Sequence, residues 1–532
     1  MGGGLAKSDQ VMRAPRLPLH PRPRYTVPSV VSPMPLSHLL TRRTLLASAA
    51  LPLLRSEDKW INLFDGRSLT GWTPNENKSS WKVADGCLSA DGPRSHLFYS
   101  GPVSQHRFKN FELEVEALAK ARANSGIYFH TEFQDSGWPA KGFEIQVNGS
   151  ALGERGYLER KKTGSLYGVR NVYKQLIADD TWFRLNLSVR GKNIQVRING
   201  TLVTEYTEPA TPLLADNAAE RGRLLSSGAI ALQCHDEGSK ALYRAVRIRP
   251  LPDDAAPPAD AAPPAPTDGI ARAILRLSAA NIPMVDYHGH LKSGFTLPQL
   301  LAHGRHQGIF YGVAINCGKG FTVQDNAGAR RFHDEMQGQP CFAAMQAEGR
   351  EWTQMFSPQA AGLFDYIFTD SMTWTDNRGR RMRTWIPAEV GQIPDAQEFM
   401  DTLVTRATGI LNSEPVDIYV NPTFIPGQLA PRYDELWTDE RILKVVRAAK
   451  ANQIAIEINN RYKLPGRRVL EAAKAEGCQF AFGTNNSSAA DIGRCEYGLE
   501  MAAALKLRWQ DFFVPADKGN RAIDRKPEAL KG

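Results

Sequence analysis

The hydrophobic pattern of this 532-residue chain changes across a proline- and alanine-rich tract at residues 251–268. Before the tract, apolar and polar residues alternate; after it, short apolar runs alternate with amphipathic stretches. A tract of this composition does not pack a core and is typical of a semi-rigid spacer. The pattern therefore predicts two domains, at 58–250 and 269–515, with a leader over 1–55 and a C-terminal tail over 516–532.

The positive charge of the chain is concentrated in the leader. The net charge is +9, and residues 1–55 contain eight basic residues against one acidic residue. The rest of the chain therefore carries only +2. A nucleic-acid-binding face needs a basic patch on a folded domain, so this distribution argues against a nucleic-acid partner.

The leader has the features of an export signal. Arg42-Arg43 precedes a short apolar run, Leu45–Leu54, that contains several small residues and is too short to cross a bilayer. It resembles a bacterial twin-arginine signal, which implies a periplasmic or secreted protein; an ordinary secretory signal is the alternative. No other segment has the 18 apolar residues that a membrane span needs, so we expect none after removal of the leader.

The first domain shows the alternation of β-strands. Apolar residues recur at every second position in residues 111–115, 183–189 and 194–198, and the last run ends at the tight-turn pair Asn199-Gly200. Residues 228–234 and 241–248 supply further strands. Many short strands without a helical period predict an all-β sandwich.

Five motifs of this domain resemble, in the same order, those of the 3-keto-disaccharide hydrolase domain family. The motifs are residues 60–72, 124–127, 142–147, 163–168 and 228–235. The resemblance covers about 190 residues. It implies a concanavalin-A-like sandwich that binds glycosides or acts on them.

The candidate site of the sandwich is centred on Glu144 and Gln146. These residues are two apart, so both face the same side of one strand, where a carboxylate could serve as a general acid or base in glycoside cleavage. We expect Glu144 to be catalytic, and Gln146, Tyr167 and Arg170 to bind substrate. For the other polar residues considered, a solvated or structural role is the better expectation: His130, Glu132 and His235.

The second domain has the rhythm of a βα barrel. Helical stretches such as 296–306, 434–452 and 466–476 separate its apolar runs. Seven runs read as strands: 284–288, 309–315, 341–346, 364–369, 416–420, 454–458 and 479–483.

Polar residues lie at the ends of these runs, where a barrel places its active site. Glu457 is the candidate catalytic residue of this set. The candidate ligand-binding residues are Asn316, Asp370, Asn421, Asn459 and Asn485. Convergence of these side chains predicts a polar pocket.

The pocket could hold one divalent metal ion. His288 and His290 are two apart on the first strand, so both imidazoles reach the same side, and Glu348 could complete the site. A bound metal would acidify a water molecule into a nucleophile. The alternative is a metal-free pocket that recognises a polyhydroxy ligand through amides, which both donate and accept hydrogen bonds.

The second domain also resembles the polymerase-and-histidinol-phosphatase (PHP) superfamily, which forms a seven-stranded βα barrel. Residues 286–290 fit its first motif, Glu348 fits a carboxylate of its third strand, and residues 455–459 fit a late strand. The chain departs from the family pattern at three other motifs. Asn316-Cys317 replaces the usual Asp-His, Asn421 replaces a His, and residues 483–487 lack the usual Asp and His. These departures argue against a three-metal centre.

The sequence therefore predicts an exported carbohydrate-active hydrolase that binds or cleaves glycosides, including 3-keto-disaccharides, on its sandwich. A second polar pocket is expected in the barrel. Two alternatives remain open: a non-enzymatic carbohydrate-binding protein, and a metal-dependent hydrolase of phosphate or carboxylic esters centred on the barrel. The oligomeric state does not follow from the sequence.

Overall fold

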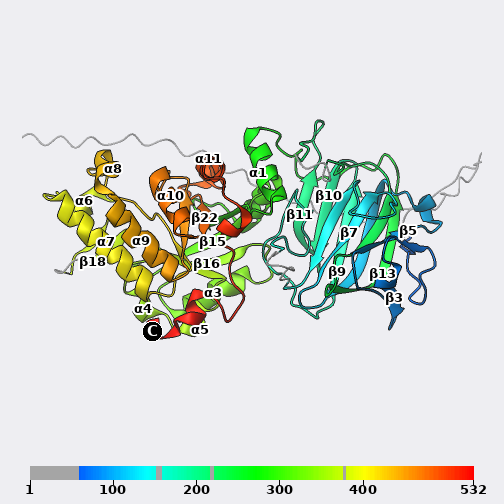
Figure 1. Ribbon diagram of the computed structural model, residues 1–532, viewed down its shortest axis with the longest axis horizontal. Helices are drawn as coiled ribbons and strands as arrows, with labels where there is room; N and C mark the ends of the chain where they lie inside the picture. Colours follow the sequence, from blue (N-terminus) through cyan, green and yellow to red (C-terminus); the bar gives the residue numbers. More distant parts are fainter. Residues whose placement is uncertain (1–58, 151–158, 216–220, 376–378) are drawn as a thin grey trace, which may run out of the picture. The chain divides into compact units, whose positions relative to one another are not determined.

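The computed structural model describes residues 59–532 except for 151–158, 216–220 and 376–378 (Figure 1). The predicted leader, with Arg42-Arg43, lies outside the described residues, so export stays a prediction. Among the helices of the described part, none combines the length and the hydropathy needed to cross a membrane.

The N-terminal domain consists of two antiparallel sheets, and the predicted all-β fold is confirmed. The larger sheet has the order β11-β10-β9-β6-β13-β4-β3, with β1 paired to β13. Its strands are β1 (Ile61–Asn62), β3 (Trp81–Ala84), β4 (Cys87–Asp91), β6 (Asn110–Ala119), β9 (Phe183–Arg190), β10 (Asn193–Ile198), β11 (Thr201–Thr207) and β13 (Lys240–Leu251).

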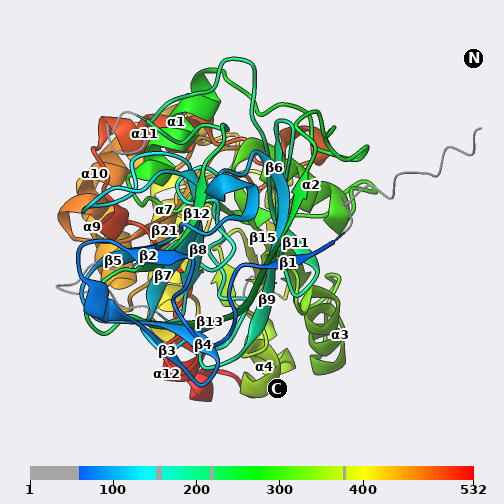
Figure 2. The same cartoon turned by 90° about the vertical axis from the view of Figure 1, so that its right-hand side faces the viewer.

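The smaller sheet has the order β2-β5-β12-β7-β8, and Figure 2 shows its strands gathered together. Its strands are β2 (Trp72–Pro74), β5 (Ser95–Tyr99), β7 (Asn124–Thr131), β8 (Phe143–Asn148) and β12 (Ala229–Cys234). Ile127, Phe129 and Ile145 point into the sandwich core and are fully buried. Because side chains alternate along a strand, the residues between them face the other side of this sheet.

Strand β6 shows how the alternation builds the larger sheet. Its apolar residues Phe111, Leu113 and Val115 are completely buried. The glutamates between them face the other side and are paired across neighbouring strands: Glu112 with Arg190 and Arg249, Glu114 with Arg247, and Glu116 with Arg244. One face therefore packs the core and the other carries a ladder of ion pairs.

The proline- and alanine-rich tract, predicted to be a semi-rigid spacer, is hydrogen-bonded to the sandwich. The Ala265 amide donates to the Thr207 carbonyl (2.9 Å), and the Thr207 hydroxyl donates to the Ala262 carbonyl (2.7 Å). Ala265 is itself buried. The tract thus lies beside the end of β11, an edge strand of its sheet, and pairs a backbone group that an edge strand leaves free.

The C-terminal domain is a closed parallel barrel, which confirms the seven predicted strand-like runs. Its strands are β14 (Val285–Gly289), β15 (Phe310–Cys317), β16 (Phe342–Ala347), β17 (Tyr366–Thr369), β20 (Ile418–Tyr419), β21 (Ala455–Asn459) and β22 (Phe480–Gly483). Figure 1 shows the barrel with its helices in green to red.

Helices precede, connect and follow the barrel strands. They are α1 (Gly269–Ala279), α2 (Leu297–Gln307), α3 (Asn326–Met336), α4 (Trp352–Met355), α5 (Pro358–Ala361), α6 (Pro387–Val390), α7 (Ala396–Ser413), α8 (Tyr433–Leu436), α9 (Asp439–Ala451), α10 (Arg467–Ala475), α11 (Glu496–Ala504) and α12 (Ala522–Arg525). A hairpin that the sequence pattern did not predict, β18 (Thr373–Thr375) with β19 (Arg381–Arg383), follows β17.

One other expectation, a single helix over 434–452, differs from the structure. The helix expected over 434–452 is divided into α8 and α9, because the extended backbone of Thr438 caps α9 and its side chain accepts from the Arg441 amide. The expected C-terminal tail is packed against the barrel. Arg521 donates to the Phe364 carbonyl (2.8 Å), and the Ala522 amide donates to Asp417 (2.9 Å).

Candidate functional site

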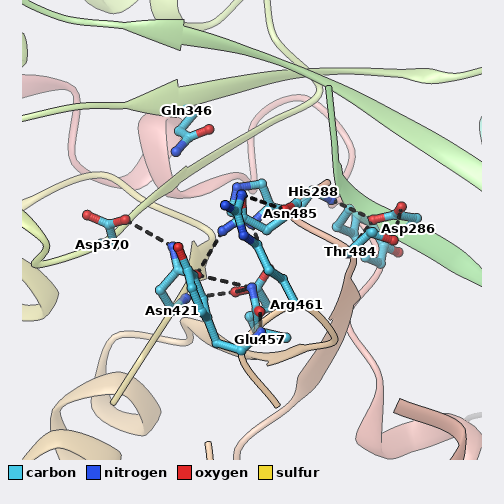
Figure 3. Close-up of polar contacts among 12 residues, drawn as sticks. Asp286, His288, Gln346, Asp370, Asn421, Glu457, Arg461, Thr484 and Asn485 are labelled. Atoms are coloured by element: carbon cyan, nitrogen blue, oxygen red, sulfur yellow. Dashed lines mark hydrogen bonds and ion pairs between the residues drawn. The ribbon is translucent and has the colours of Figure 1, made fainter. Parts of the chain in front are cut away.

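Hydrogen bonds join the polar ends of several barrel strands, as Figure 3 shows around Glu457 and Asn421. At the centre of this cluster, His288 Nδ1 on β14 lies 2.7 Å from Glu457 Oε1 on β21, and each side chain is 1% exposed. Glu457 Oε2 also accepts from the Asn421 amide (2.7 Å) and from Asn459 Nδ2 (3.0 Å). The carboxylate is thus held by three nitrogen atoms from three strand ends.

Asparagine side chains connect the rest of this cluster. Asn421 Nδ2 donates to Asp370 Oδ2, and Asn485 Nδ2 donates to Asn421 Oδ1; both distances are 3.1 Å. Asn421 and Asn485 have φ angles of +47° and +48°, in the left-handed region that asparagine tolerates better than most residues. The local backbone therefore gives a structural reason for asparagine at both positions.

Glu348 is the centre of a separate group of hydrogen bonds. Its Oε1 accepts from Asn316 Nδ2 (2.8 Å) and Gln346 Nε2 (2.9 Å), and its Oε2 accepts from Thr373 (3.2 Å). Burial, with the nearby charge of Asp370, raises the pKa of Glu348 to about 8. Its surroundings therefore disfavour the ionised form of Glu348.

The two predicted metal-binding histidines are oriented through their Nδ1 atoms. His288 Nδ1 contacts Glu457, and His290 Nδ1 contacts the Ala314 carbonyl at 3.2 Å. Metal-binding histidines commonly have one ring nitrogen fixed in this way. However, no group of three or more His, Cys, Asp or Glu residues in the described part of the chain is arranged to hold a metal ion. A metal at His288, His290 and Glu348 stays a prediction.

The barrel cluster is closed by its own side chains. The seven residues predicted for this site that are buried are His288, His290, Glu348, Asp370, Asn421, Glu457 and Asn459. Asn316 and Asn485 are half-buried. The strand ends converge as expected, but their polar groups mainly bond to one another.

The sandwich carries an open cavity of about 270 Å³ against the smaller sheet. Glu144, Gln146 and Tyr167, all predicted site residues, line it together with His235. The remaining lining residues are Asn124, Tyr128, Trp138, Pro139, Ala140, Gly142, Glu159, Arg223 and Gln233. Glu144 and Gln146 lie on β8 opposite Tyr128 and Gly126 of β7, on the face turned away from the core.

Glu144 is held and tuned by its neighbours across the sheet. The Tyr128 hydroxyl donates to Glu144 Oε2 (2.8 Å) and itself accepts from Gln233 Nε2 (3.0 Å). Burial raises the pKa of Glu144 to about 7, and the hydrogen bond from Tyr128 opposes part of that rise. A Cβ at Gly126 would lie 2.4 Å from Glu144 Oε1, so glycine is needed there for this side chain to fit.

An exposed tryptophan forms one wall of the cavity. Trp138 is 41% exposed, and the Arg94 guanidinium lies 5.0 Å from the centre of its ring. The His235 ring lies 4.8 Å away on a tilted plane. Gln134 fixes the loop, because its side chain donates to the Trp138 carbonyl (2.8 Å) and accepts from the Ala140 amide (3.1 Å).

Tyr167 forms another wall. Its hydroxyl donates to Glu159 Oε2 (3.0 Å), and the Arg223 guanidinium lies 5.2 Å from the centre of its ring. A cation, a carboxylate and a phenol therefore lie within one cavity with Glu144.

Three other residues considered from the sequence lie outside this cavity. Arg170 lies over the Tyr206 ring (5.2 Å) and donates to the Val169 carbonyl (2.8 Å). His130 contacts the Lys109 carbonyl (2.9 Å), and exposed Glu132 pairs with Lys141. The structure thus gives His130 and Glu132 structural contacts, and a substrate role for Arg170 stays a prediction.

Sequence reasoning did not select Tyr128, Trp138, Arg223 or Gln233. Tyr128 bonds to Glu144, and Gln233 bonds to Tyr128, only through the pairing of separate strands, for which the sequence has no local signal. Trp138 had a usable signal, because a tryptophan between Gly137 and Pro139 sits in a turn-forming segment where it is often exposed.

Comparison with known proteins identifies the N-terminal region. Residues 59–249 match the family model described as the 3-keto-alpha-glucoside-1,2-lyase-like domain. The N-terminal region carries this domain. A 3-keto-disaccharide hydrolase of Bacteroides thetaiotaomicron is 33% identical over 87 residues, which are 15% of this chain and 30% of that protein. The match therefore spans under a third of that relative. The resemblance of the C-terminal part to the PHP superfamily stays a prediction.

Solved structures similar to this chain cover about a third of it. One, from Parabacteroides distasonis, is described as a candidate glycosyl hydrolase; it is 21% identical, covers 36% of this chain and 94% of its own, and has a TM-score of 0.30. A carbohydrate-binding module of Bacillus subtilis is 14% identical, covers 34% of this chain and 95% of its own, and has a TM-score of 0.23.

Proposed function

We propose that the sandwich domain cleaves the glycosidic bond of a 3-keto-glycoside and that Glu144 is the base of this reaction. The observation that carries the proposal is a buried carboxylate, with a pKa of about 7, in a cavity of about 270 Å³. A general base works best when its pKa is near the working pH, because it is then both ionised and basic enough. The family of residues 59–249 and the relative from Bacteroides support a 3-keto sugar as the substrate.

The ketone explains why a single carboxylate would suffice to begin the reaction. A carbonyl at C3 acidifies the hydrogen at C2, and Glu144 takes this proton. The electron pair of the C2–H bond forms the C1–C2 double bond as the C1–O bond breaks. The aglycone oxygen leaves with the pair of that bond and takes a proton from water, and the hydroxide that remains takes the proton from Glu144, which restores the carboxylate. Addition of water to the unsaturated product would complete a net hydrolysis.

The neighbours of Glu144 suit this chemistry. Tyr128 donates to Oε2, so the other oxygen of the carboxylate is the one available to take a proton. Negative charge develops on the C3 oxygen when the C2 proton leaves, and a cation in a water-poor site stabilises such charge strongly. Arg223 lines the same cavity and is the candidate for this role.

The test is turnover by the full-length protein of methyl 3-keto-α-glucopyranoside and 3-keto-trehalose, with the unoxidised glycosides in parallel. Mass spectrometry follows release of the aglycone and exchange of the C2 hydrogen in D₂O. We expect turnover and exchange with the keto sugars alone. Glu144→Gln should lower both by at least about a hundredfold, the usual scale of general base catalysis.

Glu132→Gln is the matched control, because Glu132 is an exposed glutamate of the same domain paired with Lys141. It should retain the wild-type rate. Wild-type turnover that Glu144→Gln leaves unchanged would exclude Glu144 as the base. Absence of turnover with every keto sugar would reject the proposed reaction and favour a carbohydrate-binding protein.

A further inference from the structure

A row of polar side chains crosses the smaller sheet, and two of its members, Gln146 and Gln233, line the sandwich cavity. His96 on β5 lies opposite Gln233 on β12, and Gln146 on β8 lies opposite Gly126 on β7. The register of β12 with β7 pairs Leu232 with Ile127, which brings Gln233 next to Gly126. His96, Gln233 and Gln146 therefore lie in line on one face of the smaller sheet, with the glycine between the two glutamines.

Each member of this row has polar atoms that the rest of the chain leaves unsatisfied. Among the described residues, no hydrogen-bond partner is found for Gln146 Oε1, Gln233 Oε1 or either ring nitrogen of His96. The exposed fractions of the three residues are only 1%, 2% and 0%, respectively. A buried polar group without a partner destabilises a fold by about 1–3 kcal/mol, so three neighbours of this kind call for a specific explanation.

The contacts of the two glutamines fix which end of each amide is unsatisfied. The Tyr128 hydroxyl donates its single hydrogen to Glu144, so it must act as the acceptor in its hydrogen bond with Gln233. The atom of Gln233 that bonds to Tyr128 is therefore the amide nitrogen. The Gln146 nitrogen donates to Asn124 Oδ1 (2.6 Å). Both glutamines line the cavity, and each retains a carbonyl oxygen as an acceptor.

The row has no net charge. Burial lowers the pKa of His96 to about 3, so its imidazole is neutral. Its ring packs edge-on against Tyr128 (5.4 Å) and Trp138 (5.7 Å), both of which line the cavity. The cavity thus combines neutral hydrogen-bonding groups with an exposed indole wall. Neutral acceptors next to an aromatic face match a sugar ring, which has hydroxyl donors at its edge and apolar C–H groups on its faces.

We propose that Gln146 and Gln233 accept hydrogen bonds from ring hydroxyls of a neutral pyranoside while Trp138 stacks on the face of the same ring. This inference rests on the proposed function, because it assigns the recognition groups of the same cavity. Two carbonyl oxygens repel a ligand carbonyl, so the keto group of the substrate lies away from them. The cavity consequently binds the unoxidised glycoside as well as the keto sugar, and the ketone decides turnover but not binding.

The test measures binding of methyl α-D-glucopyranoside to the full-length protein by calorimetry, with its 2-, 4- and 6-deoxy analogues as further probes. We expect Gln146→Leu and Gln233→Leu each to raise the Kd about tenfold, which corresponds to the loss of one hydrogen bond. Trp138→Ala should raise it at least about tenfold. In Gln146→Leu, the deoxy analogue that lacks the hydroxyl bound by Gln146 should show no further loss of affinity.

Matched controls lie elsewhere in the sandwich. Trp182→Ala removes a tryptophan that also stacks with an arginine, Arg244, at 3.9 Å. Gln195→Leu removes a buried glutamine of the larger sheet, whose side chain donates to Glu205 (2.9 Å). Both should bind the sugar with wild-type affinity, and melting temperatures of all variants should show that each is folded.

The outcomes separate this inference from the proposed reaction. Keto-sugar turnover, combined with unchanged Kd and KM in folded Gln146→Leu, Gln233→Leu and Trp138→Ala, would overturn the recognition assignment and leave the reaction in place. Binding of methyl glucoside that these variants weaken, without turnover of any keto sugar, would support the recognition assignment and reject the reaction. No binding of any probe to the wild-type protein would overturn the assignment.

Discussion

The Tyr128 hydroxyl donates a hydrogen bond of 2.8 Å to Glu144 Oε2 from the neighbouring strand. Gln233 holds Tyr128 from the other side, at 3.0 Å. The pair is buried, so the carboxylate loses the stabilisation of bulk water, and the pKa of Glu144 rises to about 7. The sheet register thus produces a carboxylate whose pKa lies near neutral pH.

The pH dependence of turnover should report this carboxylate. If the ionised form of Glu144 is the base, kcat/KM should rise with pH and level off above about pH 7. The bond from Tyr128 favours the ionised form, so Tyr128→Phe should raise the pKa and move this limb to higher pH. Rate profiles of the two proteins on methyl 3-keto-α-glucopyranoside make the measurement. If kcat/KM rises at the same pH in the wild type and in Tyr128→Phe, a group other than Glu144 controls the rise.

The same carboxylate should make stability depend on pH. The pKa of Glu144 is raised from 4.5 to about 7 in the folded state, so proton binding by Glu144 stabilises the fold. This stabilisation is fully present below pH 4.5 and is lost as the pH rises through about 7. Glu144→Gln does not titrate, so it should be relatively more stable at pH 8 than at pH 4.5, by up to about 3 kcal/mol. Differential scanning calorimetry at the two pH values measures the change.

Glu132→Gln should show the opposite pH dependence of stability in the same experiment. The hydrogen bond from Lys141 lowers the pKa of Glu132, so its contribution is present at high pH and is lost on acidification. A relative gain for Glu144→Gln that is equal at both pH values would contradict a raised pKa of Glu144.

Gly126 should be required for activity although it has no functional group. A Cβ at this position would lie 2.4 Å from Oε1 and 2.9 Å from Cγ of Glu144, so Gly126→Ala must displace the carboxylate. We expect a loss of at least about tenfold in kcat on keto sugars, because a small misplacement of a reacting group has a large effect. Gly409→Ala, on α7 with open space around its Cβ, is the control and should keep full activity.

Local patterns were sufficient to predict most strands. The run expected at 454–458 is β21, Ala455–Asn459, and the run expected at 479–483 is β22, Phe480–Gly483. Buried apolar runs and strict alternation are short-range signals, so a single sequence contains them. The break between α8 and α9 was missed because the amphipathic period continues across it, although Thr438 followed by acidic residues is a typical start of a helix.

Alternation along a single strand was enough to select the candidate residues of that strand, but not their partners on other strands. Glu144 and Gln146 were selected because they share a face of β8, but their partners, Tyr128 and Asn124, lie on β7. The raised pKa of Glu144 depends on burial, which the sequence does not express. Two glycines show the same limit: a Cβ at Gly126 would meet Glu144 at 2.4 Å, and one at Gly483 would meet Glu457 at 2.0 Å. Each glycine makes room for a carboxylate that is distant in sequence.

The barrel cluster should depend on Glu457 for stability. Three nitrogen atoms converge on its carboxylate: His288 Nδ1, the Asn421 amide and Asn459 Nδ2. Glu457→Ala leaves all of them buried without this acceptor, and loss of one member of a buried pair costs about 3–5 kcal/mol. Glu457→Gln should be milder, because its amide oxygen can still accept hydrogen bonds from Asn421 and Asn459. Melting temperatures should therefore fall in the order wild type, Glu457→Gln, Glu457→Ala.

Glu435→Ala is the control for this experiment. It removes an exposed partner of Arg432 and should have a melting temperature close to that of the wild type. Equal melting temperatures for Glu457→Ala and wild type would show that this carboxylate does not hold the strand ends together.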